Sequence, residues 1–174
     1  STIFTYVIGF ANGYNDYTSS PTEETIQQYL ANDGILEISA RSGYVKKEVG
    51  EYDLYLRDEK TQLTLGIFTY DLNLHKQITE EDIIDVQVEY FKDTRENFVI
   101  YKNKEIISLE DKKITTIEYN GKTETSDECI YKFSTIVFEE KQDYIVFAIQ
   151  VLLEEDYNKY SNELFEILKT ATIK

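Results

Sequence analysis

The sequence predicts an α+β fold in which a mainly antiparallel sheet carries helices packed on its faces. Three observations support this prediction. Runs of alternating apolar and polar residues, typical of half-buried strands, occupy much of the chain. Short polar connections join neighbouring runs, so adjacent strands are expected to pair as antiparallel hairpins. Segments with helical periodicity interrupt this pattern, and each needs a sheet face on which to bury its apolar stripe.

The N-terminal segment is expected to form a strand, a loop and a helix. The β-branched and aromatic run TIFTYVIGF predicts a strand over 2–10, and the polar run ANGYNDYTSS predicts a loop. A helix is then expected between Ser20 and Gly34. Its signals are Ser20 as N-cap, Pro21 at the first helical position, Glu23 completing a capping box, and an apolar stripe of Ile26, Tyr29 and Leu30.

The middle of the chain changes to a two-residue period. The run ILEIS at 35–39 predicts a short strand. EYDLYLRD at 51–58 and QLTLGIFTY at 62–70 alternate in polarity and are expected to form a hairpin. ITEEDIIDVQVEYFKD is the clearest helix, because Thr79 is a good N-cap and the acids at 80–82 favour the positive end of the helix dipole.

From Phe98 onward the pattern predicts a meander of strands and a closing helix. YIVFAIQVLL at 144–153 is apolar on both faces and is therefore expected to be a central strand. The other predicted strands are FVIYKNKEIIS, KKITTIEY and CIYKFSTIVFEE. A turn is expected at Asn120-Gly121, which is the favoured pair for a type I′ hairpin. The closing helix is expected over 154–168.

Five apolar residues are expected to be nearly fully buried: Leu54, Leu65, Phe147, Ile149 and Leu164.

This order of elements resembles the Mog1/PsbP-like family of small αβα domains. The resemblance runs from about residue 36 to the C-terminus and depends on the paired strands, the helix from Thr79, the meander and the terminal helix YNKYSNELFEILKTATI. It implies an αβα sandwich and a non-catalytic binding role, since the Mog1 branch engages a small GTPase and the PsbP branch supports photosystem II. No binding motif of either branch is recognisable here, so no partner residue is transferred.

Length and composition predict one globular domain over 1–174. The chain of 174 residues is 41% hydrophobic and holds 15 Tyr and 9 Phe, which is enough to build a core without disulfides or metals. We divide it into a Mog1/PsbP-like body over 35–174 and an N-terminal part over 1–34 whose placement the pattern leaves open.

The formal net charge of −15 argues against direct binding of nucleic acid or anionic lipid. No apolar run is long enough to span a membrane. The single cysteine fits a reducing compartment, so a cytoplasmic location is expected. The alternative is an extracytoplasmic location after removal of a leader that is not present in this chain.

The residues that carry most enzyme chemistry are scarce, and we expect no enzyme and no cofactor. His75 is the only histidine and Cys129 the only cysteine, and neither lies in a nucleophile motif. Together they fall short of the usual zinc ligand sets. The acids at 79–82 and 154–156 are expected at helix starts, and those at 125–128 lack the ligand spacing of a calcium loop.

The candidate binding residues are Tyr14 and Tyr17, because Tyr with Asn and Gly is the composition of adaptable binding loops. An edge strand and a loop lying over the core would also account for this composition. The function expected from the sequence is a protein-binding module of unknown partner. The alternative is an acidic immunity or inhibitor protein that blocks a basic, nucleic-acid-cleaving toxin.

Overall fold

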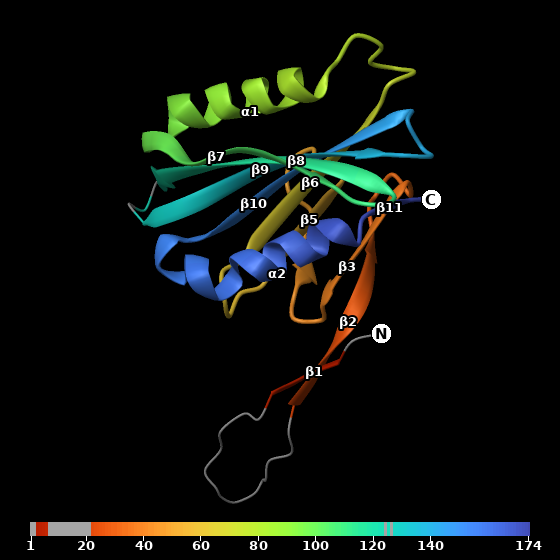
Figure 1. Cartoon of the computed structure of the whole chain (residues 1–174). Helices are drawn as coiled ribbons and strands as arrows, with labels where there is room; N and C mark the ends of the chain where they lie inside the picture. Colours follow the sequence, from red (N-terminus) through yellow and green to blue (C-terminus); the bar gives the residue numbers. More distant parts are fainter. Residues whose placement is uncertain (1–2, 7–21, 124, 126) are drawn as a thin grey trace, which may run out of the picture.

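A computed structural model describes residues 3–6, 22–123, 125 and 127–174, and it arranges them as two antiparallel sheets with two α-helices (Figure 1). The four-stranded sheet has the order β1 (Ile3–Tyr6), β2 (Thr22–Leu30), β3 (Leu36–Arg41) and β11 (Thr172–Ile173). The seven-stranded sheet has the order β4 (Val45–Lys46), β5 (Leu54–Arg57), β6 (Thr64–Asp71), β10 (Tyr144–Leu153), β9 (Glu128–Phe138), β8 (Lys112–Lys122) and β7 (Glu96–Ser108). The helices are α1 (Glu80–Thr94) and α2 (Tyr157–Lys169), with a 3-10 turn, η1 (Glu154–Asp156), before α2.

The prediction of a helix between Ser20 and Gly34 is wrong, because Thr22–Leu30 form strand β2. The predicted N-cap Ser20 and first helical residue Pro21 lie outside the described residues. β2 pairs with β1 on one side and β3 on the other, and these non-local bonds outweigh a local capping signal. Tyr29 is buried, and its hydroxyl donates to the carbonyl oxygens of Arg41 and Tyr44 at 3.0 and 2.7 Å. Gly34, predicted to end the helix, lies with a φ of +74° in the turn between β2, which ends at Leu30, and β3.

The strands predicted from the two-residue period are confirmed in the middle of the chain. β5 and β6 pair antiparallel as the expected hairpin, and β3 covers most of the segment predicted at 35–39. β10 lies between β6 and β9, so its predicted central position is also confirmed. At the N-terminus β1 spans Ile3–Tyr6, and the rest of the strand predicted over 2–10 lies outside the described residues.

The predicted turn at Asn120-Gly121 is wrong, because both residues lie inside β8. They pair with Ile130 and Cys129 of β9, and the ladder continues to Lys122. The Phe98 ring packs so close to the backbone at position 121 that only glycine fits there, because a Cβ would lie 2.7 Å from Cδ1 of Phe98. A glycine can therefore mark a close approach within a strand as well as a turn.

Helix α1 begins as the sequence predicts. Thr79 and Asp82 form a capping box in which each side chain accepts from the other residue's backbone N–H at 3.1 Å. In Figure 1 α1 lies along one side of the seven-stranded sheet. Its buried face packs in a cluster with Phe133 and Phe147 of the sheet. The α1 residues in that cluster are Ile83, Ile84, Val88 and Phe91.

Helix α2 is shorter at its start than predicted over 154–168, because Glu154–Asp156 form the 3-10 turn and the α-helix begins at Tyr157. In Figure 1 α2 lies on the side of the large sheet opposite α1, beside β3. Its buried residues Leu164, Ile167 and Leu168 pack with strand residues in a second cluster.

The five predicted core residues are all nearly fully buried. Their exposed fractions are 0% for Leu54, Leu65, Phe147 and Leu164 and 4% for Ile149. They divide between the two clusters: Phe147 and Ile149 pack on the α1 side, and the three leucines pack on the α2 side. A core on both sides explains why β10 is apolar on both of its faces.

Candidate functional site

The sequence-predicted binding residues Tyr14 and Tyr17 lie outside the described residues. Their role therefore stays a prediction.

His75 and Cys129 lie in different surroundings. His75 is exposed in the connection between β6 and α1, where its ring contacts that of Tyr70. Cys129 is buried at the start of β9, and burial raises the pKa of its thiol to about 11. A thiol with a raised pKa is a weak nucleophile at neutral pH. Burial therefore favours the neutral thiol of Cys129 at neutral pH.

The acidic segments take structural roles where they are described. Asp82 completes the cap of α1, and Asp127 accepts a hydrogen bond from the Thr125 hydroxyl at 2.9 Å within the β8–β9 connection. Within the described ranges, no three or more His, Cys, Asp or Glu side chains are grouped to hold a metal ion. Neither described helix is both long and apolar enough to cross a membrane.

Strand β7 forms an exposed edge of the large sheet. It ends the strand order, so its outer side has no strand neighbour in the described part of the chain. All but two of its 13 residues are exposed. The unpaired N–H and C=O groups of such an edge are a template for another strand. Large apolar side chains are exposed along it: Val99 at 58%, Ile100 at 53%, Tyr101 at 44% and Ile106 at 56%.

Irregularities in the β7–β8 pairing direct the β7 side chains toward both faces of the sheet. The register shifts between Ile100 and Lys102 and again between Lys102 and Glu105. Such bulges re-aim side chains and increase the local twist. As a result Ile106 pairs opposite Thr115, on the face that α1 borders, whereas Lys102 pairs opposite Glu118, on the face that α2 borders.

A cavity of about 390 Å³ lies between α1 and the β7–β8 hairpin. Its apolar lining includes Ile84 from α1 and Ile106 from β7. Two ion pairs join the helix to the strands beside it: Lys113 with Glu80 at 3.3 Å and Lys104 with Glu81 at 3.8 Å. The cavity therefore combines an apolar floor with a charged rim.

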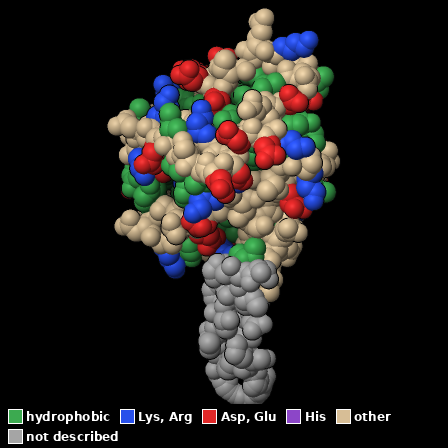
Figure 2. Space-filling model, turned by 45° about the vertical axis from the view of Figure 1, so that its right-hand side comes forward, with side chains coloured by type: hydrophobic (Ala, Val, Ile, Leu, Met, Phe, Trp, Pro, Cys, Tyr) green, Lys and Arg blue, Asp and Glu red, His purple; other side chains and the backbone are tan. Residues whose placement is uncertain are grey.

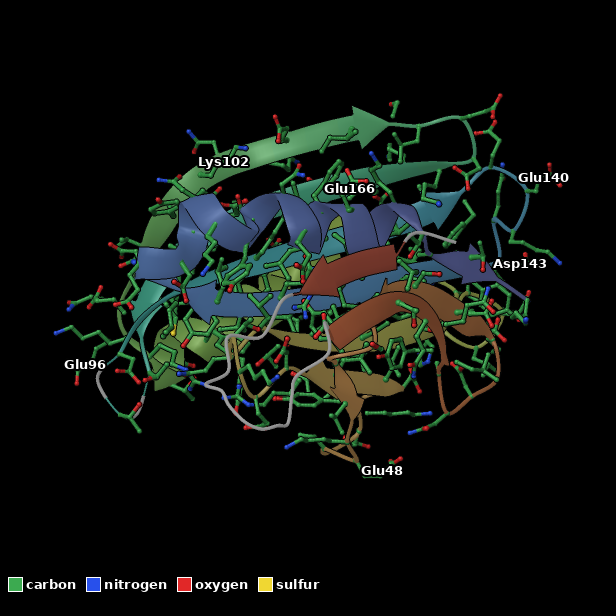
Figure 3. All side chains as sticks on the ribbon, turned by 90° about the horizontal axis from the view of Figure 1, so that it is seen from below. Glu48, Glu96, Lys102, Glu140, Asp143 and Glu166 are labelled. Carbon is green, nitrogen blue, oxygen red and sulfur yellow. The ribbon has the colours of Figure 1, made fainter. Side chains whose placement is uncertain are left out.

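A second cavity, of about 230 Å³, lies on the other face between β7 and α2. Lys102 and Glu105 line it from β7, and Tyr157 and Phe165 line it from α2. Figure 3 looks at this face and shows β7, which carries Lys102, alongside α2, which carries Glu166. Strand β7 is thus a wall of both cavities, which makes it the centre of the candidate site.

Sequence reasoning predicted β7 as a strand but did not identify it as a site. The available signal was the run Val99–Tyr101, where three large apolar residues follow one another without alternation. A half-buried strand would place at least one of them in the core. That all three are exposed depends on β7 being an edge strand, which local sequence does not encode.

No protein-family model and no curated protein sequence matches this chain. Similar solved structures include cyanobacterial PsbP (CyanoP) from Synechocystis sp. PCC 6803, with a TM-score of 0.59 and 14% identity over 93% of this chain and 98% of that one. The Ran-binding protein Mog1p of Saccharomyces cerevisiae gives a TM-score of 0.55 and 10% identity over 86% of this chain and 96% of that one. LpqN, which is involved in cell envelope biogenesis of Mycobacterium tuberculosis, gives a TM-score of 0.57 and 8% identity over 87% of this chain and 91% of that one.

These likenesses confirm, at the level of the fold, the Mog1/PsbP-like resemblance stated from the sequence. Identities of 8–14% transfer no binding residue from those proteins to this chain. The function must therefore be argued from the surfaces of this molecule.

Proposed function

We propose that this chain is a non-catalytic protein-binding module that accepts an extended segment of a partner protein on the outer side of β7. The observation that carries this proposal is an edge strand of 13 residues that pairs with β8 on one side, has no strand on its other side among the described residues, and exposes four large apolar side chains. Strand addition supplies main-chain hydrogen bonds for affinity, and side-chain contacts on alternate residues supply specificity. The cavity between β7 and α1 would receive side chains from one face of that segment.

Three further observations support a binding role. A fold neighbour, Mog1p, is itself a Ran-binding protein. The described residues offer no reactive thiol, since the pKa of Cys129 is raised. Edge strands of monomeric proteins are usually short, charged or covered; β7 carries charged residues at its centre, but it is 13 residues long and has large apolar side chains exposed on either side of them, such as Val99 and Ile106.

The finer features of the sequence-based prediction remain part of this proposal. These are a single domain over 1–174, an αβα sandwich, a function without a cofactor and a cytoplasmic location. The placement of α1 and α2 on opposite sides of the large sheet in Figure 1 supports the sandwich. The buried, unpaired thiol of Cys129 is compatible with a reducing compartment.

The alternative is an acidic inhibitor of a basic, nucleic-acid-cleaving toxin, and the net charge of −15 favours it. An inhibitor of that kind would present its acids on one contiguous face. On the face in Figure 2, acidic and basic side chains are interspersed, which favours the binding module.

Binding measurements on β7 variants test the proposal. A partner is captured from cell extract with the full chain, purified, and titrated calorimetrically against Val99→Asp and Ile106→Asp. Each variant should weaken binding about 30-fold, the loss typical of a hot-spot residue. Leu74→Asp is the matched control, because Leu74 is 77% exposed in the loop before α1 and distant in sequence from β7. Hydrogen exchange should also show new protection of the β7 amides in the complex. Binding that survives both β7 variants, without new protection, would exclude this edge as the site.

A further inference from the structure

Three polar side chains on adjacent strands form a buried row beneath α2. Glu118 of β8 pairs opposite Lys132 of β9, which pairs opposite Gln150 of β10. Residues directly opposite one another in a sheet project from the same face. Gln150 donates from Nε2 to the carbonyl oxygen of Leu164 in α2 at 2.8 Å, which places the row on the α2 face. The three residues are 3%, 6% and 0% exposed.

Lys132 is the unusual member of this row. Its ammonium forms no ion pair and no hydrogen bond with any described residue, and it lies 5.4 Å from the centre of the Phe165 ring. Burial lowers the pKa of Lys132, and the attraction of Glu118 opposes this only in part. An ammonium held out of water needs a compensating anion. Since Lys132 lines the cavity between β7 and α2, such an anion has room to bind.

Glu118 is the complementary group in the same cavity. Its Oε1 accepts a hydrogen bond from the Tyr157 hydroxyl at 2.6 Å, and it forms no ion pair with any residue that the structure describes. Burial raises the pKa of Tyr157, and so does its hydrogen bond to Glu118. The hydroxyl therefore stays protonated and remains a donor. One hydrogen bond leaves most of the acceptor capacity of a carboxylate unused.

The cavity that these two groups face suits a small molecule. Its volume is about 230 Å³, below the range of roughly 300–1,000 Å³ that is typical of sites for drug-sized ligands. A single water occupies about 30 Å³, so the space is larger than one water requires. Tyr157, Phe165 and Ile107 supply apolar walls, and Lys102 pairs with Glu105 at 3.5 Å on the β7 side.

We propose that this cavity binds a free, zwitterionic α-amino acid, with its carboxylate on Lys132 and its ammonium on Glu118. A zwitterion supplies a carboxylate for the Lys132 ammonium and an ammonium for the Glu118 carboxylate in one small ligand, whereas the two residues attract each other across the strands without forming an ion pair. A simple carboxylate would give Glu118 no contacting cation, and a simple amine would give Lys132 no contacting anion. The aromatic walls favour the ligand's ammonium and its apolar side chain.

Ligand titrations of the full chain test this site directly. Glycine, alanine and leucine are compared with acetate and ethylamine by calorimetry and by thermal unfolding. A ligand that binds only the folded state raises the melting temperature. We expect saturable binding of at least one amino acid to one site, with a rise in melting temperature that neither acetate nor ethylamine reproduces at the same concentration.

Two substitutions assign the binding to the proposed groups. Lys132→Met keeps a side chain of similar shape without the charge, and Glu118→Gln removes the negative charge; each should weaken binding at least about tenfold. Lys113→Met is the control, because Lys113 pairs with Glu80 beside the other cavity. It should bind as the unaltered chain does. In an NMR titration of the lysine ammonium groups, the pKa of Lys132 should rise when the ligand binds, since a carboxylate stabilises the charged form.

Three results would overturn the proposal: no saturable binding of any amino acid, equal binding of acetate and amino acids, or unchanged binding in Lys132→Met. The first and third results would leave Glu118 and Lys132 as a cross-strand pair that serves the fold alone, and equal binding of acetate would make the cavity a site for carboxylates in which Glu118 binds no ammonium. None of these results depends on the proposed partner strand at β7, because the measurements use no partner protein.

Discussion

The guanidinium of Arg41, on β3, lies 2.9 Å from the carboxylate of Glu163, on α2. Arg41 is only 4% exposed, and it also pairs with Glu24 of β2 at 3.1 Å and with Asp58 at 2.9 Å. One buried cation therefore joins the four-stranded sheet, the end of β5 and the terminal helix. Tyr44 adds a hydrogen bond from its hydroxyl to Glu163 at 2.8 Å.

Removing this cation should destabilise the fold strongly. Arg41→Met leaves three carboxylates close together without their counter-ion, and breaking a buried pair from one side costs about 3–5 kcal/mol. Urea denaturation would measure the loss. Arg57→Met is the control, because Arg57 pairs with Glu59, whose side chain is 60% exposed; exposed pairs contribute about 0–1 kcal/mol. Equal losses of unfolding free energy in the two variants would show that the ion pairs of buried Arg41 stabilise the fold no more than the exposed pair of Arg57.

The same cluster should make stability depend on acid pH. Burial tends to raise the pKa of Asp58, but hydrogen bonds from Arg41 and from the backbone of Lys60 outweigh burial, and the pKa is lowered. A carboxyl whose pKa is lowered on folding contributes stability above its unfolded pKa, about 3.9 for Asp. That contribution is lost as the pH falls through the folded pKa.

Urea denaturation between neutral pH and the acid limit would test this dependence. The unaltered chain should lose stability as the pH falls below about 4, and Asp58→Asn should lose less over the same interval. Other carboxylates also titrate in this range, so the difference between the two proteins carries the information. Parallel curves for the two proteins would contradict the assignment to Asp58.

Gly121→Ala should destabilise the protein through Phe98. The new Cβ would lie 2.7 Å from the Phe98 ring, which is stacked on Tyr119 with ring centres 4.7 Å apart. Forcing extra volume into a packed contact costs about 1–3 kcal/mol. Phe98→Leu should relieve part of this loss, so a double-mutant cycle should show coupling between positions 98 and 121. A purely additive cycle would mean that backbone conformation, rather than space, requires the glycine.

Truncating the predicted core residues should cost about 2–5 kcal/mol each. Leu65→Ala and Ile149→Ala test one side of the large sheet each, since Leu65 packs on the α2 side and Ile149 on the α1 side. Leu74→Ala removes the same atoms from a side chain that is 77% exposed, and it should change stability by less than about 0.5 kcal/mol. Similar losses at all three positions would contradict the two-sided core.

The buried residues Leu54 and Leu65 could be predicted because their strands alternate apolar and polar residues, and this alternation is visible in the local sequence. The secondary structure was predicted wrongly where pairing between distant strands determines the conformation. The capping signal near Ser20 is compatible with a helix, yet Tyr29 forms its hydrogen bonds only when β2 lies against β3. Asn120-Gly121 carries a turn signal, but the space that Phe98 needs explains the glycine.

The candidate sites were harder to predict from the sequence than the fold. Lys132 and Glu118 are separated along the chain and meet only through the register of β8 and β9. Their burial also depends on α2, which contributes Tyr157 and Phe165 to the same cavity. The exposure of β7 follows from its position at the end of the strand order, and no residue of β7 encodes that position.

The last prediction concerns the aromatic residues that the sequence alone singled out. If Tyr14 and Tyr17 contribute to binding, replacing both with Ala should weaken the complex with the purified partner by about 2 kcal/mol or more, as hot-spot tyrosines do. Tyr is enriched at such sites because its ring offers a large contact surface at low entropy cost. Isothermal titration calorimetry would measure the change, and Tyr90→Ala is the matched control, because Tyr90 is 59% exposed on α1.

A salt titration separates this aromatic account from the electrostatic one. Affinity that depends on exposed acids of a chain with a formal charge of −15 should fall steeply with ionic strength. Affinity that depends on aromatic and main-chain contacts should change little. Weak salt dependence with a large loss in the double tyrosine variant would support the aromatic loop. Strong salt dependence with unchanged affinity in that variant would reject it and favour the acidic inhibitor. Loss of affinity in the β7 variants alone, with little effect of salt, would locate binding at the edge strand without a contribution from Tyr14 and Tyr17.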